Sequence, residues 1–182
     1  MNTYIALLRG INVSGQKKIL MADLKRLFEA LGFVSVTTYI QSGNVVFQDA
    51  LKNTTDLETI VKEGIQKHFG FDVPVLVIKP KDLQLIYKNN PFSEKITNGK
   101  VDPKKMFFTF LSKEPESALI KELPVPSDGE EFVIVKKVIY FYAANGYGKT
   151  RLNNNFFERK MKCNATTRNL KTVIKMLEIS SL

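Results

Sequence analysis

The order of predicted secondary-structure elements in residues 1–80 is the feature that most constrains the fold of this chain. Apolar and β-branched runs alternate with segments whose apolar residues recur every three or four positions. The predicted elements are a strand within 3–10, a helix within 21–32, two strands within 34–48, a helix within 57–70 and a strand within 73–80. Ser42-Gly43-Asn44 indicates a hairpin turn between the two middle strands. The order βαββαβ is the split arrangement of ferredoxin-like folds.

The second half of the chain repeats only part of this order. The predicted elements are a strand within 105–112, a helix between Pro115 and Pro124, two strands that meet near Lys136-Lys137, and helices within 154–162 and 168–179. We therefore expect an α+β protein of two packed subdomains. Residues 1–80 form the ferredoxin-like subdomain and 81–103 a connector rich in turn formers. Residues 104–182 form the second subdomain, βαββ followed by basic C-terminal helices.

The positive charge of the chain is concentrated near its C-terminus. The formal net charge is +9, and residues 135–182 carry ten lysine and arginine residues against only Glu158 and Glu178. A localised basic field favours phosphates, nucleic acid or an anionic surface. The alternative is a solvated surface that aids solubility.

Simple counts exclude several classes of protein. No apolar run reaches the roughly 20 residues that cross a bilayer, so we expect no membrane partner. Cys163 is the only cysteine and His68 the only histidine in the sequence. These counts exclude an internal disulfide framework and a structural zinc site, and we expect no cofactor. Because MNTYIALLRG has neither a basic leader nor a small-residue cleavage site, we expect a cytoplasmic protein.

The segment Ala143–Thr150, AANGYGKT, matches the residue pattern of a phosphate-binding loop. Such a loop needs a helix that starts at its Lys-Thr pair, and a carboxylate at the end of a neighbouring strand to hold magnesium. Here Asn153-Asn154-Asn155 follow, which indicate a loop or a late helix cap, and no predicted strand ends directly on a carboxylate. A second near match, GINVSGQKK, has Gln16 in place of the lysine. We therefore expect neither segment to split a nucleoside triphosphate.

Three motifs occur in order along the chain: YIALLRGINVSG, TYIQSGNVVF and NGYGKTRLNNNFFERKMKCNATTRN. Together they resemble a bacterial family catalogued as domain of unknown function 1697, over essentially the whole chain. The resemblance implies a compact α+β protein of a bacterial cytoplasm and supplies no activity. The family's positions are occupied here by Arg9, Gly10, Asn12, Gln41, Ser42, Gly43, Asn44, Gly146, Gly148, Ala165, Thr166, Thr167, Arg168 and Asn169. The departures from its pattern are Ser14, Gln16, Lys162 and Leu170.

The segment NATTRNLKTV is the first candidate for binding an anion. A helix N-terminus carries unpaired N–H groups and about half a positive charge. We expect Thr166 or Thr167 to cap a helix with Arg168 in its first turn, and Lys171 to complete a phosphate or carboxylate cradle. In the alternative, Arg168 pairs internally with a carboxylate such as Glu158 and is structural.

Other basic residues near this segment are interleaved with aromatic ones, as in proteins that bind single-stranded nucleic acid. Tyr147, in a loop between glycines, is the aromatic residue that we expect to be exposed. The candidate anion- or nucleic-acid-binding residues are Lys149, Arg151, Arg159, Thr166, Thr167, Arg168, Asn169 and Lys171.

These observations leave three functions open. The first is a non-catalytic binding protein for a phosphate-bearing partner, either nucleic acid or a small molecule, through the basic C-terminal region. The second is an enzyme that acts on a small anionic metabolite in a cleft between the subdomains. Its candidate residues are Arg9, Asn12, Ser42 and Arg168, and the possible pocket also includes Asn44 and Tyr147. In the third, the shared motifs are structural. We identify no catalytic residue.

Overall fold

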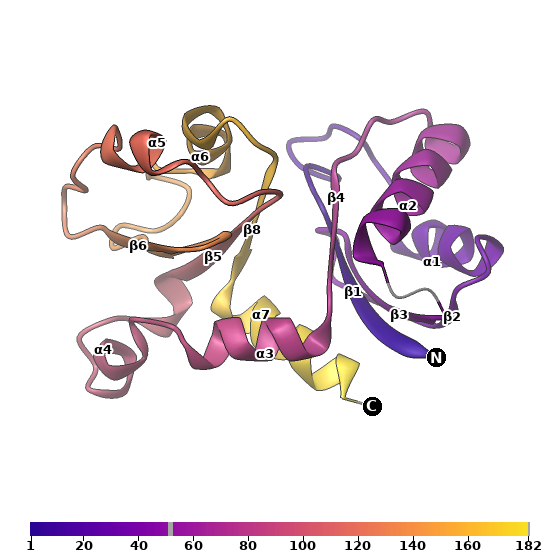
Figure 1. Ribbon diagram of the computed structural model, residues 1–182, viewed down its shortest axis with the longest axis horizontal. Coiled ribbons are helices and arrows are strands. Elements are labelled where there is room, and N and C mark those ends of the chain that lie inside the picture. The colour runs from indigo at the N-terminus through magenta and orange to yellow at the C-terminus, as the bar shows by residue number, and fades with distance from the viewer. Residues whose placement is uncertain (51–52, 182) are drawn as a thin grey trace. The chain divides into compact units, whose positions relative to one another are not determined.

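The structure is a computed structural model that describes residues 1–50 and 53–181 (Figure 1). The chain forms two compact units. The first unit contains Met1–Gln84 and the C-terminal residues from Lys175 on, and the second contains Leu85–Ile174. The division falls inside helix α3 (Pro80–Lys88) and inside helix α7 (Leu170–Ser180). None of the described helices is long and apolar enough to cross a membrane.

The first unit has the predicted ferredoxin-like order. Its elements are β1 (Asn2–Leu8), α1 (Met21–Ala30), β2 (Val34–Tyr39), β3 (Asn44–Asp49), α2 (Thr54–Phe69) and β4 (Val75–Ile78). The four strands form one antiparallel sheet in the order β2-β3-β1-β4. Both helices lie on one side of this sheet (Figure 1) and bury their apolar faces against it. The prediction for residues 1–80 is confirmed in its element order.

The second unit is built on the same plan. Its elements after α3 are α4 (Ser93–Thr97), the 3₁₀ helix η1 (Pro103–Lys105), β5 (Met106–Leu111), α5 (Ser117–Lys121), β6 (Glu131–Val135), β7 (Val138–Tyr142), α6 (Asn154–Met161), β8 (Ala165–Asn169) and α7. Its antiparallel sheet has the order β6-β7-β5-β8, the counterpart of the first. The α+β fold class is thus confirmed, and 81–103 contains helical elements.

Strand β8 corrects the prediction that the second unit is βαββ followed only by helices. Residues 165–169 pair with β5 along their whole length instead of forming a helix N-terminus. Thr166 and Thr167 therefore do not cap α7. Asn169 does so, because its Oδ1 accepts a hydrogen bond of 2.8 Å from the Thr172 N–H.

The backbone conformation and close neighbours of Gly43 show why the Ser42-Gly43-Asn44 turn needs a glycine. Its φ is +73°, and a Cβ at this position would lie 2.6 Å from the Leu8 Cβ and 2.9 Å from the Ile11 Cδ1. The Gly43 carbonyl also accepts a hydrogen bond of 2.8 Å from the Leu8 N–H. The turn is thereby packed onto the end of β1.

We expect Gly43→Ala to lower the free energy of unfolding by about 2–4 kcal/mol, because strain at positive φ adds to the steric clash. Gly15→Ala is the matched control, since Gly15 has φ +75° but nothing within 4 Å of the added Cβ. It should cost only the strain, about 1–2 kcal/mol. Urea denaturation measures both values, and equal losses would contradict the packing role of Gly43.

Candidate anion-binding surface

The eight predicted anion-binding residues all lie in the second unit, but in three separate places. Lys149 and Arg151 belong to the loop between β7 and α6, and Arg159 lies in the last turn of α6. The remaining five lie in β8 and at the start of α7. The four side chains Lys149, Arg151, Arg159 and Lys171 are exposed, whereas Arg168 and Thr166 are buried.

Arg168 binds its own strand. Its Nη1 donates hydrogen bonds of 2.9 Å to the Thr166 Oγ1 and to the Thr167 carbonyl. The pKa of Arg168 is lowered to about 10, because the lowering by burial outweighs the opposite effect of the nearby Tyr147. Since β8 is at the edge of its sheet, the bond to Thr167 satisfies a carbonyl that no further strand can reach. These two bonds hold the Arg168 side chain along β8, and neither is the carboxylate pair that the structural alternative expects.

Glu158, the partner considered for Arg168, binds the same strand edge. Its Oε1 accepts a hydrogen bond of 2.9 Å from the Ala165 N–H. A carboxylate from α6 and a guanidinium from β8 thus bind backbone groups of the same edge strand. This arrangement ties the helix to the sheet.

A chain of hydrogen bonds connects the sheet to the N-terminus of α6. The Thr109 and Thr167 hydroxyls lie 2.8 Å apart, and the Thr167 hydroxyl donates to the Asn154 Oδ1 at 2.9 Å. The Asn154 N–H donates in turn to the Tyr147 hydroxyl at 2.8 Å. The Tyr147 ring is half-buried, 4.5 Å from the Phe107 ring. The prediction that Tyr147 is an exposed stacking group is wrong.

The other pocket candidates lie in the first unit, where they hold loops in place. The Asn12 Nδ2 donates to the Ile19 and Gln41 carbonyls at 2.8 and 2.9 Å, and its Oδ1 accepts from the Ile19 N–H. The Asn44 Nδ2 donates to the Tyr39 carbonyl and to the Ser42 Oγ.

Arg9 follows β1 and is partly exposed, and its N–H donates to the Pro74 carbonyl at 2.9 Å. Arg9, Asn12, Ser42 and Asn44 therefore belong to one unit and Tyr147 to the other.

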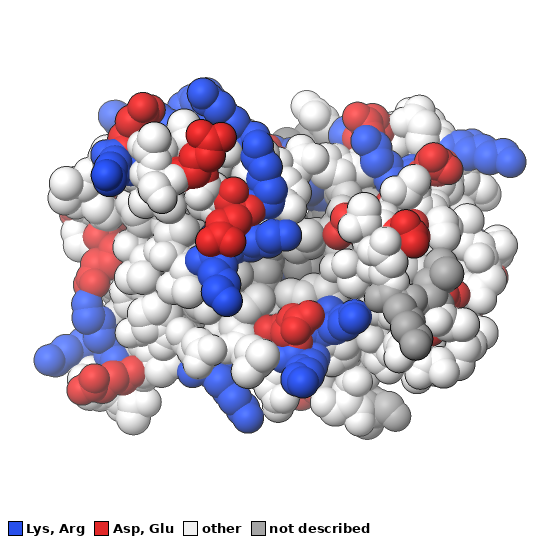
Figure 2. All heavy atoms as spheres, in the orientation of Figure 1, with Lys and Arg blue, Asp and Glu red and all other residues white. Residues whose placement is uncertain are grey.

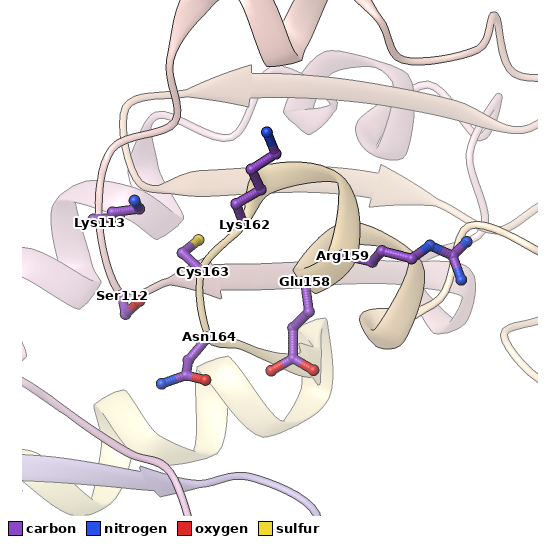
Figure 3. A pocket seen from close by; sticks show the side chains of 7 residues that line it. All are labelled: Ser112, Lys113, Glu158, Arg159, Lys162, Cys163 and Asn164. Carbon is purple, nitrogen blue, oxygen red and sulfur yellow. The ribbon is translucent and has the colours of Figure 1, made fainter.

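A shallow hollow of about 580 Å³ lies at the C-terminal end of α6 (Figure 3). Its lining residues are Ser112, Lys113, Glu158, Arg159, Lys162, Cys163 and Asn164. Figure 3 shows that Glu158, Arg159 and Lys162 leave the helix in three different directions. The cations of this hollow are spread over a surface and do not converge on one point.

A second hollow, of about 570 Å³, lies beside the loop that precedes α6. Its basic residues are Lys149 and Arg151, and its acidic residues are Asp128 and Glu130. Pro124, Val125, Pro126, Leu152 and Phe156 supply apolar surface. This lining is mixed in charge, so the hollow does not by itself select an anion.

The second unit carries most of the excess charge. It has 16 lysine and arginine residues against nine acidic ones, a net charge of +7, and the rest of the chain has +2. The face in Figure 2 shows basic side chains over the region of α6, with acidic ones among them. The exposed cations that form no ion pair with any residue in 1–50 or 53–181 include Lys113, Lys149, Arg151, Arg159 and Lys162.

Lys113 is the basic residue that sequence reasoning missed. It follows β5 directly, and the Ser112 N–H donates to the Asn164 carbonyl at 2.9 Å, which places Lys113 beside the end of α6. Only the pairing of β5 with β8 reveals this neighbourhood. The described residues contain no group of three or more His, Cys, Asp or Glu side chains that could hold a metal ion.

Comparison with known proteins identifies a family and a fold. The model of the family described as "Protein of unknown function (DUF1697)" matches residues 1–140. A solved structure of a conserved bacterial protein from Streptococcus pneumoniae superposes with a TM-score of 0.72 at 24% sequence identity, covering 97% of each chain. No curated protein matches the chain.

We expect Thr167→Val to lower the free energy of unfolding by about 1–3 kcal/mol, because the Asn154 Oδ1 loses its donor. Thr109→Val, which leaves the bond between Thr167 and Asn154 intact, should cost less. Urea denaturation compares the two variants. If Thr167→Val left the free energy of unfolding unchanged but weakened oligonucleotide binding, the prediction would be wrong and Thr167 would belong to the binding surface.

Proposed function

The chain belongs to the family of unknown function DUF1697, whose description names no activity, and we propose that it is a non-catalytic binding protein for a phosphate-bearing partner. Nucleic acid is the first candidate. The binding surface is the outside of the second unit around α6. With a single cysteine, the chain suits the reducing bacterial cytoplasm, which we propose as its location.

The position of exposed cations at both ends of α6 carries this proposal. Lys149 and Arg151 precede the helix, and Arg159 and Lys162 lie at its end. A helix of eight residues is about 12 Å long. Cations this far apart suit a chain of repeated phosphates, which can contact both ends, better than one small anion.

The two groups of cations differ in their relation to the helix dipole. At the C-terminal end, Arg159 and Lys162 face the negative pole, so a solvated surface accounts for them without a partner. Lys149 and Arg151 precede the N-cap Asn153, where their charge adds to the positive pole. Asp128 and Glu130 line the same hollow and offset part of this charge. A bound phosphate would offset more of it, which is why Lys149 and Arg151 are the stronger evidence for a polyanion.

The alternative, an enzyme acting on a small anionic metabolite, loses support on its own candidate residues. Asn12 and Asn44 are already bonded within the first unit, and Ser42 accepts from Asn44. Tyr147 accepts a hydrogen bond from the start of α6. We therefore propose no catalytic role for this set.

Binding to single-stranded oligonucleotides of mixed sequence tests the proposal. Fluorescence anisotropy should detect binding at about 50 mM salt and a loss of affinity as salt rises, with a log–log slope of about −0.7 per phosphate contact. Lys149→Ala/Arg151→Ala and Arg159→Ala/Lys162→Ala should each weaken binding and make the slope shallower by about 1.4.

A matched control separates local contacts from net charge. Lys18→Ala/Lys67→Ala removes two exposed cations from the first unit, and Lys67 lies in the last turn of α2 as Arg159 lies in that of α6. This variant should keep the salt slope. No binding at about 50 mM salt, or equal weakening by all three double variants, would refute the proposal.

A further inference from the structure

Three of the four strands at sheet edges have their outer edges protected. The Val77 N–H of β4 donates to the Glu58 Oε1 at 2.8 Å. Strand β8 has the two side-chain bonds described above. Strand β2 is distorted by a register shift between Val34 and Thr37, with Ser35 at φ +52°. Such devices prevent unwanted pairing with another chain.

Strand β6 is the fourth, and it has a regular, open edge. Its ladder with β7 runs without a shift from Glu131↔Tyr142 to Val135↔Val138. The Leu111 N–H donates to the Lys137 carbonyl, so the backbone groups of Lys137 point towards β5. Because successive residues of a strand point their N–H and C=O groups to opposite sides, those of Val138 and Tyr140 point towards β6. The backbone groups of Phe132 and Ile134 then lie on the outer edge.

No hydrogen bond from the described part of the chain reaches those outer groups of Phe132 and Ile134. On the sheet face that bears Glu131, two apolar side chains are exposed, Val133 by 38% and Val135 by 45%. An unprotected strand with exposed valines is suited to pairing with another strand.

We propose that β6 pairs antiparallel with β6 of a second copy of this chain, around a two-fold axis at Val133. This register pairs all five residues of the strand. It sets Phe132 of one copy opposite Ile134 of the other, so that the outward-facing N–H and C=O groups of both strands meet. The two sheets then continue into one another.

The charges that flank β6 favour a second copy as the occupant. Glu130 precedes the strand and Lys136 follows it, and neither forms an ion pair with residues 1–50 or 53–181. Around the two-fold axis, Glu130 of each copy lies opposite Lys136 of the other. A shift by two residues would set Lys136 opposite Phe132 and lose this match, so the flanking charges select the register.

Sedimentation equilibrium of the full chain tests the pairing, at concentrations up to about 1 mM and about 0.15 M salt. We expect a concentration-dependent dimer, and slower hydrogen exchange at the Phe132 and Ile134 amides as it forms. Val133→Lys sets two like charges at the axis and should raise the dissociation constant at least about tenfold. Val125→Lys adds the same charge at a site that is 90% exposed and should leave the dimer intact.

A charge exchange keeps the test decisive if Val133→Lys fails to fold. Glu130→Lys and Lys136→Glu should each weaken the dimer, and the double variant should restore it. A monomer over the whole concentration range would overturn the proposal, and so would a dimer that none of these variants weakens. Neither result depends on oligonucleotide binding, so this proposal and the proposed function fail separately.

Discussion

In each unit a hydrogen bond between a helix carboxylate and the last strand ties that helix to the sheet. In the first unit the Glu58 carboxylate accepts from the Val77 N–H, and in the second the Glu158 carboxylate accepts from the Ala165 N–H. An amide at a sheet edge has no neighbouring strand, and leaving such a group unsatisfied when it is buried costs about 1–3 kcal/mol. One carboxylate therefore meets this need and sets the position of the helix.

The two units share this bond as part of a common plan. In each, an asparagine caps the helix five residues before the glutamate: Asn53 accepts from the Thr55 N–H and Asn153 from the Phe156 N–H. The strand order of the two sheets is also equivalent. The correspondence lies in one helix cap, one edge bond and the topology.

The sequence predicted secondary structure correctly where the apolar pattern and the turn residues indicate the same elements. The strands of the first unit are rich in β-branched and apolar residues, and the turn before β3 contains the expected Ser42-Gly43-Asn44. Strand β8 was missed because its sequence, ATTRN, is polar. Those side chains bond to the strand's own edge and to α6 instead of forming an apolar face. Missing β8 made Thr166 and Thr167 look like helix caps, and it hid the position of Lys113 beside the end of α6. Tyr147 was misjudged because its glycine-flanked loop returns to the sheet.

The C-terminal residues complete the unit that begins the chain. Residues from Lys175 on belong to the first unit, although the whole of Leu85–Ile174 comes before them. The Glu178 carboxylate raises the pKa of Lys175, and Tyr39 of the first unit raises it further. During synthesis, domains generally fold in the order in which they emerge from the ribosome. Here Met1–Gln84 is translated before Leu85–Ile174, yet its unit is complete only after the residues from Lys175 on have also left the ribosome.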